Sequence, residues 1–176
     1  MAYRERLHEP RRRVVATGLG AITAAGPDVA ALRAALHGER TCIGDVTLFD
    51  TEGLRTHIAG EVRAVPEPRL LPRAARARAS RSDRFALIAA EEALAHGGIT
   101  LPFVDPARVG VAIGSSTGGM LETESSYRTR LASEPARAWR KRLAAATVAA
   151  PTDLVAAALG IAGPRLSPST ACSSGA

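Results

Sequence analysis

The sequence predicts an α/β fold, in which short buried strands alternate with helices. Residues 14–17 and 109–113 are apolar runs with the length and the β-branched content typical of buried strands. Ala-rich segments with apolar residues on one face lie between and after these runs, and glycines close them. A third apolar stretch precedes the last ten residues, so the order is strand, helix, strand, helix, strand.

Composition limits the classes of protein that the chain can belong to. Its 176 residues are enough to bury one core, and the net charge of +6 would attract an acidic partner, either a nucleic acid or an acidic protein. Cys42 and Cys172 stand at neither metal-binding nor redox spacing, so we predict no zinc site, no structural disulfide and a reducing, cytoplasmic location. We find no secretory signal and no membrane span, so no membrane partner is expected.

The first strand is followed by closely spaced glycines. Residues 1–12 are charged and are predicted to be a disordered lead-in, and the strand at 14–17 leads directly to Gly18 and Gly20. A dinucleotide-binding fingerprint would need a third glycine where Thr23 stands, so we predict no nicotinamide cofactor. The alternative is that the two glycines allow close packing of the backbone.

The helices are predicted from their capping residues. Asp28 suits the N-terminus of a helix that Gly38 ends. Ser82 is the expected N-cap of a long Ala- and Glu-rich helix that stops at Gly97, and residues 120–131 can form a further helix. Thr152 is the expected cap of a helix that ends at Gly160.

Residues 69–84 are rich in arginine and allow three interpretations. They can form a solvated surface, a docking patch for an acidic protein or a nucleic-acid site. Single-strand binding modules interleave basic residues with stacking aromatics, and here Phe85 is the only aromatic nearby, so we predict no nucleic-acid partner. The arginines are Arg69, Arg73, Arg76, Arg78, Arg81 and Arg84.

The last ten residues place one cysteine among small neighbours. Residues 167–176 (SPSTACSSGA) follow a predicted strand, and small side chains let the backbone turn sharply and let a substrate approach. A thiol at such a turn, facing a helix N-terminus, would be a good nucleophile, so Cys172 is a candidate catalytic residue. The alternative is an inert structural cysteine.

Four landmarks in order resemble the β-ketoacyl synthases, the condensing enzymes of fatty-acid and polyketide assembly. The landmarks are residues 13–20 (RVVATGLG), 82–87 (SDRFAL), 109–119 (VGVAIGSSTGG), and 159–164 (LGIAGP) with 169–175 (STACSSG). This resemblance implies the N-terminal half of a thiolase-like fold, with a mixed, mostly parallel sheet and helices, over one domain at residues 13–176. It implies decarboxylative Claisen condensation of an acyl thioester with malonyl carrier protein, an acyl carrier protein as partner, and no cofactor or metal.

The resemblance also assigns site residues. Cys172 takes the nucleophile's place, and Thr117 falls where the family limits the length of the acyl chain. Arg73 and Arg76 are the expected docking residues for the acidic carrier protein. Pro168 departs from the family, which has an apolar residue inside the nucleophile strand, and Thr152 stands where the family has asparagine.

The family's two catalytic histidines follow the nucleophile, and here the sequence ends four residues after Cys172. His8, His37, His57 and His96 all precede it and match no family motif. We therefore expect an N-terminal portion, cut just after the nucleophile turn, that has no condensing activity alone and needs a homodimer or a complementing second half. The alternative functions are a non-catalytic remnant that binds a carrier protein or a synthase subunit, and a basic nucleic-acid binder.

Overall fold

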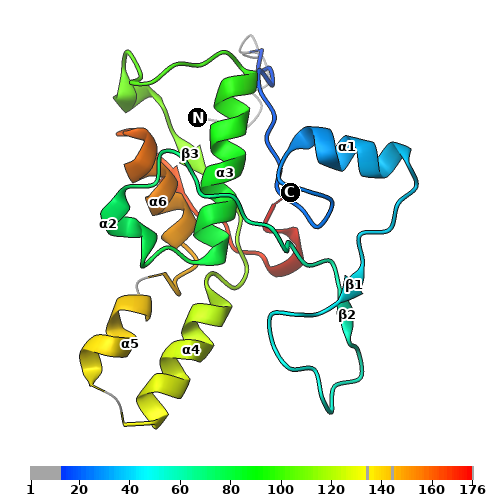
Figure 1. The fold of residues 1–176 in the computed structure, drawn as a ribbon. Helices are drawn as coiled ribbons and strands as arrows, with labels where there is room; N and C mark the ends of the chain where they lie inside the picture. Colours follow the sequence, from blue (N-terminus) through cyan, green and yellow to red (C-terminus); the bar gives the residue numbers. More distant parts are fainter. Residues whose placement is uncertain (1–12, 134, 144, 176) are drawn as a thin grey trace, which may run out of the picture.

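The computed structural model of the protein describes residues 13–133, 135–143 and 145–175, so the predicted disordered lead-in at 1–12 lies outside the described residues. Figure 1 shows the elements in chain order. The helices are α1 (Val29–His37), α2 (Arg73–Arg76), α3 (Arg81–His96), α4 (Met120–Leu131), α5 (Ala136–Leu143) and α6 (Ala150–Leu159). The strands are β1 (Gly44–Asp45), β2 (Ile58–Ala59), β3 (Val111–Ala112) and β4 (Arg165–Leu166), and the 3₁₀ turns are η2 (Pro106–Arg108) and η3 (Ala171–Ser173).

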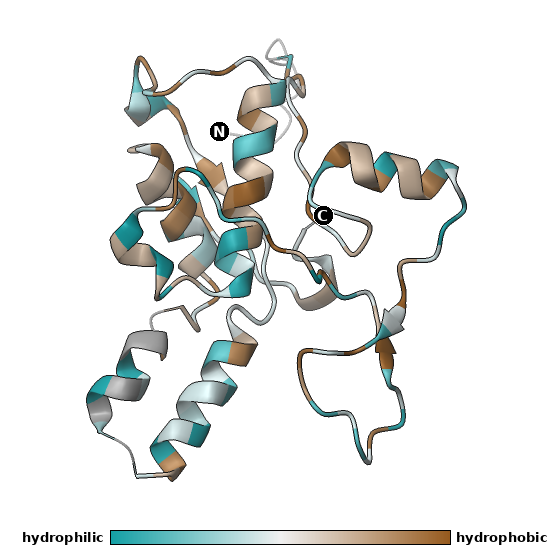
Figure 2. Ribbon diagram, viewed as in Figure 1, coloured by the Kyte–Doolittle hydropathy of each residue, from teal (hydrophilic) through white to brown (hydrophobic). Residues whose placement is uncertain are grey.

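The core lies where α3 and α6 pack on each other and on β3 and β4. Leu87 of α3 and Ala156 of α6 are both fully buried there. Figure 2 shows apolar residues gathered where α3, α6 and β3 meet, whereas α4 is mostly polar along its length. Removing these apolar side chains from water is the main stabilising contribution to this part of the fold.

The predicted α/β alternation is confirmed in the pairing of β3 and β4, which lie parallel with Val111 opposite Arg165 and Ala112 opposite Leu166. The chain between them crosses through α4, α5 and α6, as parallel strands require. β1 and β2 form a separate antiparallel pair at the side of the molecule (Figure 1).

The predicted buried strand at residues 14–17 is wrong. No described strand pairs with this segment, and Val14 is 92% exposed. The segment that follows runs along α3 instead, because Leu19 N donates to His96 Nδ1 and Ala21 N donates to Glu92 Oε2.

The prediction that Gly18 and Gly20 allow close packing is confirmed. A Cβ atom on Gly18 would stand 2.0 Å from the Ala93 carbonyl oxygen of α3, and one on Gly20 would stand 1.9 Å from the Ala89 carbonyl oxygen. Any side chain at these positions would push the segment away from the helix.

The capping predictions are partly confirmed. Asp28 caps α1 by accepting from Ala31 N, and Gly97 follows α3, but the N-cap of α3 is Ser80 rather than the expected Ser82. The Ser80 hydroxyl accepts from Asp83 N while the Asp83 carboxyl accepts from Ser80 N, which is a capping box. Ser82 cannot form one, because the residue three positions later is Phe85. Asp83 is buried, and this burial raises the pKa of its carboxyl above the ordinary value of 3.8.

The helix expected over residues 153–159, with Thr152 as its cap, begins three residues earlier at Ala150, so Thr152 is not its cap. It lies inside α6, buried, and its hydroxyl is 2.7 Å from the Ser167 hydroxyl just beyond β4. Gly160 ends α6 in a left-handed conformation with φ +68°, as glycine allows. The predicted helix at 120–131 is confirmed as α4.

α4 and α5 pack on each other and extend from the α3–α6 core as a helical hairpin (Figure 1). Arg81 N donates to Glu122 Oε1 at 3.2 Å, which ties the start of α4 to the start of α3. Within the described part of the chain, none of the helices combines the length and the apolar run that crossing a membrane requires.

Candidate functional site

Cys172 lies in the 3₁₀ turn η3, which begins five residues after β4 ends. Its thiol is free, and the residue is exposed. The predicted strand-then-turn placement of Cys172 is therefore present, but the strand is shorter than expected and stops before the turn.

Pro168 explains where the strand stops. Val111 N donates to the Pro164 carbonyl at 2.9 Å, Ile113 N to the Leu166 carbonyl at 3.0 Å and Ser115 N to the Pro168 carbonyl at 3.2 Å. In a parallel ladder the return bond to Ile113 would come from the amide of residue 168, and proline has no N–H. Only one half of the ladder therefore continues toward Cys172.

The turn around Cys172 is organised by one carbonyl group. Ala171 has φ +55°, in the left-handed region that a residue with a Cβ enters at a cost of about 1–2 kcal/mol. Its carbonyl oxygen accepts from the Ser174 hydroxyl at 2.6 Å and from Ser174 N at 3.1 Å. The same hydroxyl lies 3.0 Å from Thr170 N, and the Ser173 hydroxyl donates to the Thr170 carbonyl at 3.0 Å.

The loop at residues 114–119, which follows β3, packs directly against this turn. The Ser116 hydroxyl donates to the Ala171 carbonyl at 2.9 Å. A Cβ atom on Gly114 would stand 1.7 Å from the Ser174 carbonyl oxygen, so the close approach requires glycine. The structure thus brings the loop that carries Thr117 to the turn that carries Cys172, and Thr117 itself is exposed.

The two predicted docking residues lie apart from this turn, on α2. Arg76 Nε is 3.3 Å from Glu67 Oε1, and Arg84 pairs with the second oxygen of the same carboxylate. Arg73 is exposed and makes no ion pair with any residue that the structure describes. Among these arginines, Arg73 therefore offers the more available charge.

The described histidines belong to other segments than the Cys172 turn, and the hydrogen bonds of two of them do not involve that turn. His57 Nδ1 lies 2.9 Å from the Thr51 hydroxyl, His96 Nδ1 accepts from Leu19 N, and His37 stands in the last turn of α1. The remaining histidine, His8, is outside the described residues.

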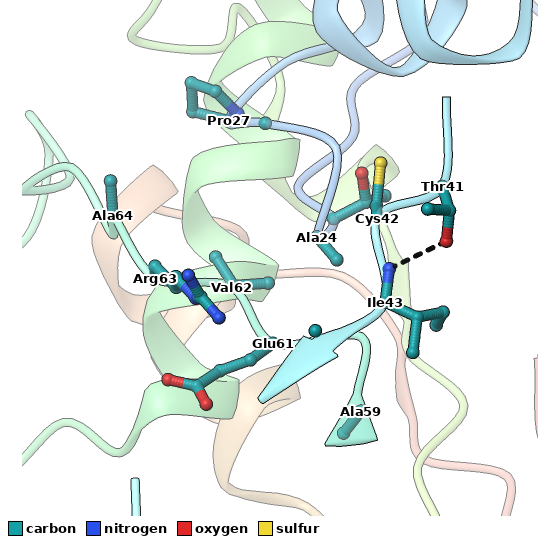
Figure 3. A pocket seen from close by; sticks show the side chains of 13 residues that line it. Ala24, Pro27, Thr41, Cys42, Ile43, Ala59, Glu61, Val62, Arg63 and Ala64 are labelled. Carbon is teal, nitrogen blue, oxygen red and sulfur yellow. Dashed lines mark hydrogen bonds between the residues drawn. The ribbon is translucent and has the colours of Figure 1, made fainter. Parts of the chain in front are cut away.

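The second thiol, Cys42, borders a cavity of about 360 Å³ between the loop before α1 and the β1–β2 pair. Figure 3 shows Cys42 and Ile43 on one side of this cavity and Glu61, Val62 and Arg63 on the other. Hydrogen bonds from the Thr47 hydroxyl and amide lower the pKa of the Glu61 carboxyl, and these bonds occupy both of its oxygens. None of the predicted site residues lines this cavity.

Sequence reasoning missed the hydroxyl groups that hold the Cys172 turn. Ser116 and Thr152 contact the segment at 167–174 from other elements, and Ser167 and Ser174 lie within that segment. The available signal was the density of serine and threonine in both the loop at 115–117 and the segment at 167–174. Which hydroxyl would meet which carbonyl depends on the parallel register of β3 and β4, which the sequence does not contain.

Comparison with known proteins identifies the family to which this sequence is similar. Residues 11–176 match the family described as "Beta-ketoacyl synthase, N-terminal domain". The chain is 37% identical over 175 residues to a putative polyketide beta-ketoacyl synthase 1 of Streptomyces cyaneus, a match that covers 93% of this chain and 40% of the relative. It is 32% identical over 165 residues to 3-oxoacyl-[acyl-carrier-protein] synthase 2 of Coxiella burnetii, covering 94% of this chain and 40% of that protein.

A solved structure, "The ishigamide ketosynthase/chain length factor", superposes with a TM-score of 0.83 at 25% identity, over 93% of this chain and 41% of the other. The chain thus spans about 40% of the length of its relatives. Its α/β fold corresponds to part of the thiolase-like ketosynthase fold, as the sequence predicts. This chain belongs to the β-ketoacyl synthase family, whose N-terminal domain it matches.

Proposed function

We propose that the protein is an acyltransferase of fatty-acid or polyketide assembly, in which Cys172 accepts an acyl group from an acyl carrier protein. The observation that supports this most is the exposed thiol of Cys172 in a tight turn of small residues, with the loop at 114–119 held against it. The names of the two relatives, a polyketide synthase and an acyl-carrier-protein synthase, indicate the substrate class.

The first step is a thioester exchange. Cys172 Sγ, as the thiolate, attacks the carbonyl carbon of the acyl thioester, a new S–C bond forms, and the bond to the carrier's sulfur breaks. The carrier thiolate leaves and takes up the proton that Cys172 lost. Thr117, on the adjacent loop, is proposed to contact the acyl chain.

The second step is the family's condensation. A malonyl thioester loses carbon dioxide, and the resulting carbanion attacks the carbonyl carbon of the acyl-cysteine. A C–C bond forms, the S–C bond to Cys172 breaks, and the Cys172 thiolate leaves, so the chain, now on the carrier, is two carbons longer. Hydrogen-bond donors must stabilise the charge that develops on a thioester oxygen. We assign these donors to a second half of the active site, supplied by a further segment or by a partner in a dimer, and we place the protein in the reducing cytoplasm, where its thiols stay free.

Carrier-protein docking is proposed on α2. The carrier is expected to be acidic, and the exposed Arg73 offers it a cation with no intramolecular ion pair among the described residues. Arg76 shares its charge with Glu67, so we expect it to contribute less.

Reversing the charge at Arg73 is expected to weaken carrier binding about fivefold at low salt, since an exposed charge pair contributes up to about 1 kcal/mol. Surface plasmon resonance of R73E against immobilised carrier protein measures this. R55E carries the same charge change on the exposed loop between β1 and β2 and serves as control. Equal weakening by both variants would mean a general effect of net charge and would contradict a carrier-docking site on α2.

Loss of the thiol is expected to abolish acylation. C172A, incubated with a radiolabelled acyl-carrier thioester, should retain no label, because no other group can replace the thiolate at that position. C42A removes the other cysteine, which borders the separate cavity, and should be labelled like wild type. Full labelling of C172A together with loss of label in C42A would show that Cys42, and not Cys172, accepts the acyl group.

A further inference from the structure

The residue directly before Cys172 has a backbone conformation that needs support. Ala171, with φ +55°, is one of the described non-glycine residues in the left-handed region. Such a conformation persists only where the surroundings hold it, and the peptide that joins Ala171 to Cys172 sets the direction of the thiol. Whatever fixes the Ala171 carbonyl therefore also fixes Cys172.

Two sources of hydrogen bonds fix that carbonyl. Ser174, three residues later in the same turn, donates through its hydroxyl and its amide. Ser116 donates through its hydroxyl at 2.9 Å and comes from 55 residues earlier in the chain. Ser174 moves with the turn, whereas Ser116 connects the turn to the loop after β3 and so to the sheet.

Apart from these two serines, the backbone provides few hydrogen bonds that could hold the turn in place. Pro168 has no N–H, so the return half of the β3–β4 ladder ends before the turn. The Thr152–Ser167 hydroxyl pair, 2.7 Å apart, anchors the start of the segment to α6. Between this pair and the turn, the described links to the loop after β3 are the Ser115 amide bond to Pro168 and the Ser116 hydroxyl bond to Ala171.

We infer that Ser116 is a positioning residue, whose hydroxyl holds the Ala171 carbonyl and thereby aims the Cys172 thiol at the incoming acyl carbon. This inference rests on the proposed function of Cys172. It assigns to the loop at 114–119 a part in aligning the nucleophile, in addition to the contact with the acyl chain proposed for Thr117.

The matched variants are S116A, S115A and S116T in the full-length protein. S115A removes a neighbouring hydroxyl that makes no hydrogen bond with any residue in the described part of the chain, and it keeps the Ser115 amide bond to Pro168. S116T keeps a hydroxyl at this exposed position. Three quantities are measured: acylation rate from the carrier thioester, iodoacetamide alkylation of Cys172 relative to Cys42, and hydrogen exchange of the peptide that contains Cys172.

For S116A we expect acylation to be about tenfold slower, because small misplacements of a reacting atom are costly. We expect about fivefold faster exchange in the peptide around Cys172, the effect of one lost hydrogen bond. Exchange in α3 and the alkylation ratio should not change, because Cys172 is already exposed. S115A should match wild type in every measurement, and S116T should restore acylation and exchange.

The outcomes separate the two proposals. If S116A and S115A exchange alike around Cys172, Ser116 does not position the turn. Faster exchange of S116A in α3 as well would mean a general loss of fold and would equally contradict a positioning role. If wild type is not acylated at all, the proposed function fails, and the exchange measurement alone decides whether Ser116 holds the turn.

Discussion

G114A is expected to slow the rate of acyl transfer about 100-fold, because the added methyl group would displace the turn that carries Cys172. Its Cβ would stand 1.7 Å from the Ser174 carbonyl oxygen and 2.8 Å from Gly175 N. Both neighbours are backbone atoms, so no side-chain rotation can make room, and the whole turn must move away from the loop. Initial rates of acylation from a carrier thioester measure the loss.

The control for this variant is G175A, in the same segment. A Cβ at Gly175 meets no atom within 4 Å, and Gly175 is not among the described glycines with positive φ. G175A should therefore be acylated at the wild-type rate. A G114A protein as active as G175A would show that acylation of Cys172 does not depend on the contact between the loop and the turn.

G20A is expected to lower the free energy of unfolding by about 3 kcal/mol, at the upper end of the cost of overpacking. The new Cβ would stand 1.9 Å from the Ala89 carbonyl oxygen and 2.8 Å from the Ala89 carbonyl carbon, both in the backbone of α3. The segment at 18–21 would have to leave the helix, which would also stretch the bond from Ala21 N to Glu92. Urea titration followed by far-ultraviolet circular dichroism measures the change.

G60A makes the same substitution where space exists. Its Cβ would lie 3.5 Å from the Ala24 Cβ and 3.6 Å from the Ile43 Cδ1, which are ordinary contact distances. We expect a change within about 0.5 kcal/mol of wild type. Equal destabilisation by G20A and G60A would contradict the close packing of residues 18–20 on α3.

Local sequence signals predicted the helices well. Asp28, Gly97 and Gly160 act as end signals whose effect depends on a few neighbouring residues, and the structure uses each of them. Ser82 was wrong as a cap because Ser80 takes that role, and Thr152 was wrong because α6 already begins at Ala150. Ser80 has Asp83 at the spacing of a capping box, whereas the Thr152 hydroxyl lies at hydrogen-bond distance from the Ser167 hydroxyl.

Strand signals were less reliable, because a strand needs a partner that its own sequence does not specify. Residues 14–17 have strand composition but lie unpaired in the described structure, whereas the run at 109–113 pairs through β3. At the site, the small residues around Cys172 indicated the turn. The contact from Ser116 to Ala171 spans 55 positions and follows from the β3–β4 register, so no local pattern could have identified it.

Peptide-resolved mass spectrometry of the wild-type protein, after brief exposure to an acyl-carrier thioester, tests the role of Cys172 most directly. Cleavage after Arg40 and Arg165 separates the two cysteines into different peptides, so the position of the acyl group can be read without any substitution. We predict that the acyl mass appears on the peptide that contains Cys172 and is removed by hydroxylamine, as a thioester would be. An acyl group found on the Cys42 peptide, or no acylated peptide at all, would contradict the proposal that this thiol carries the acyl chain.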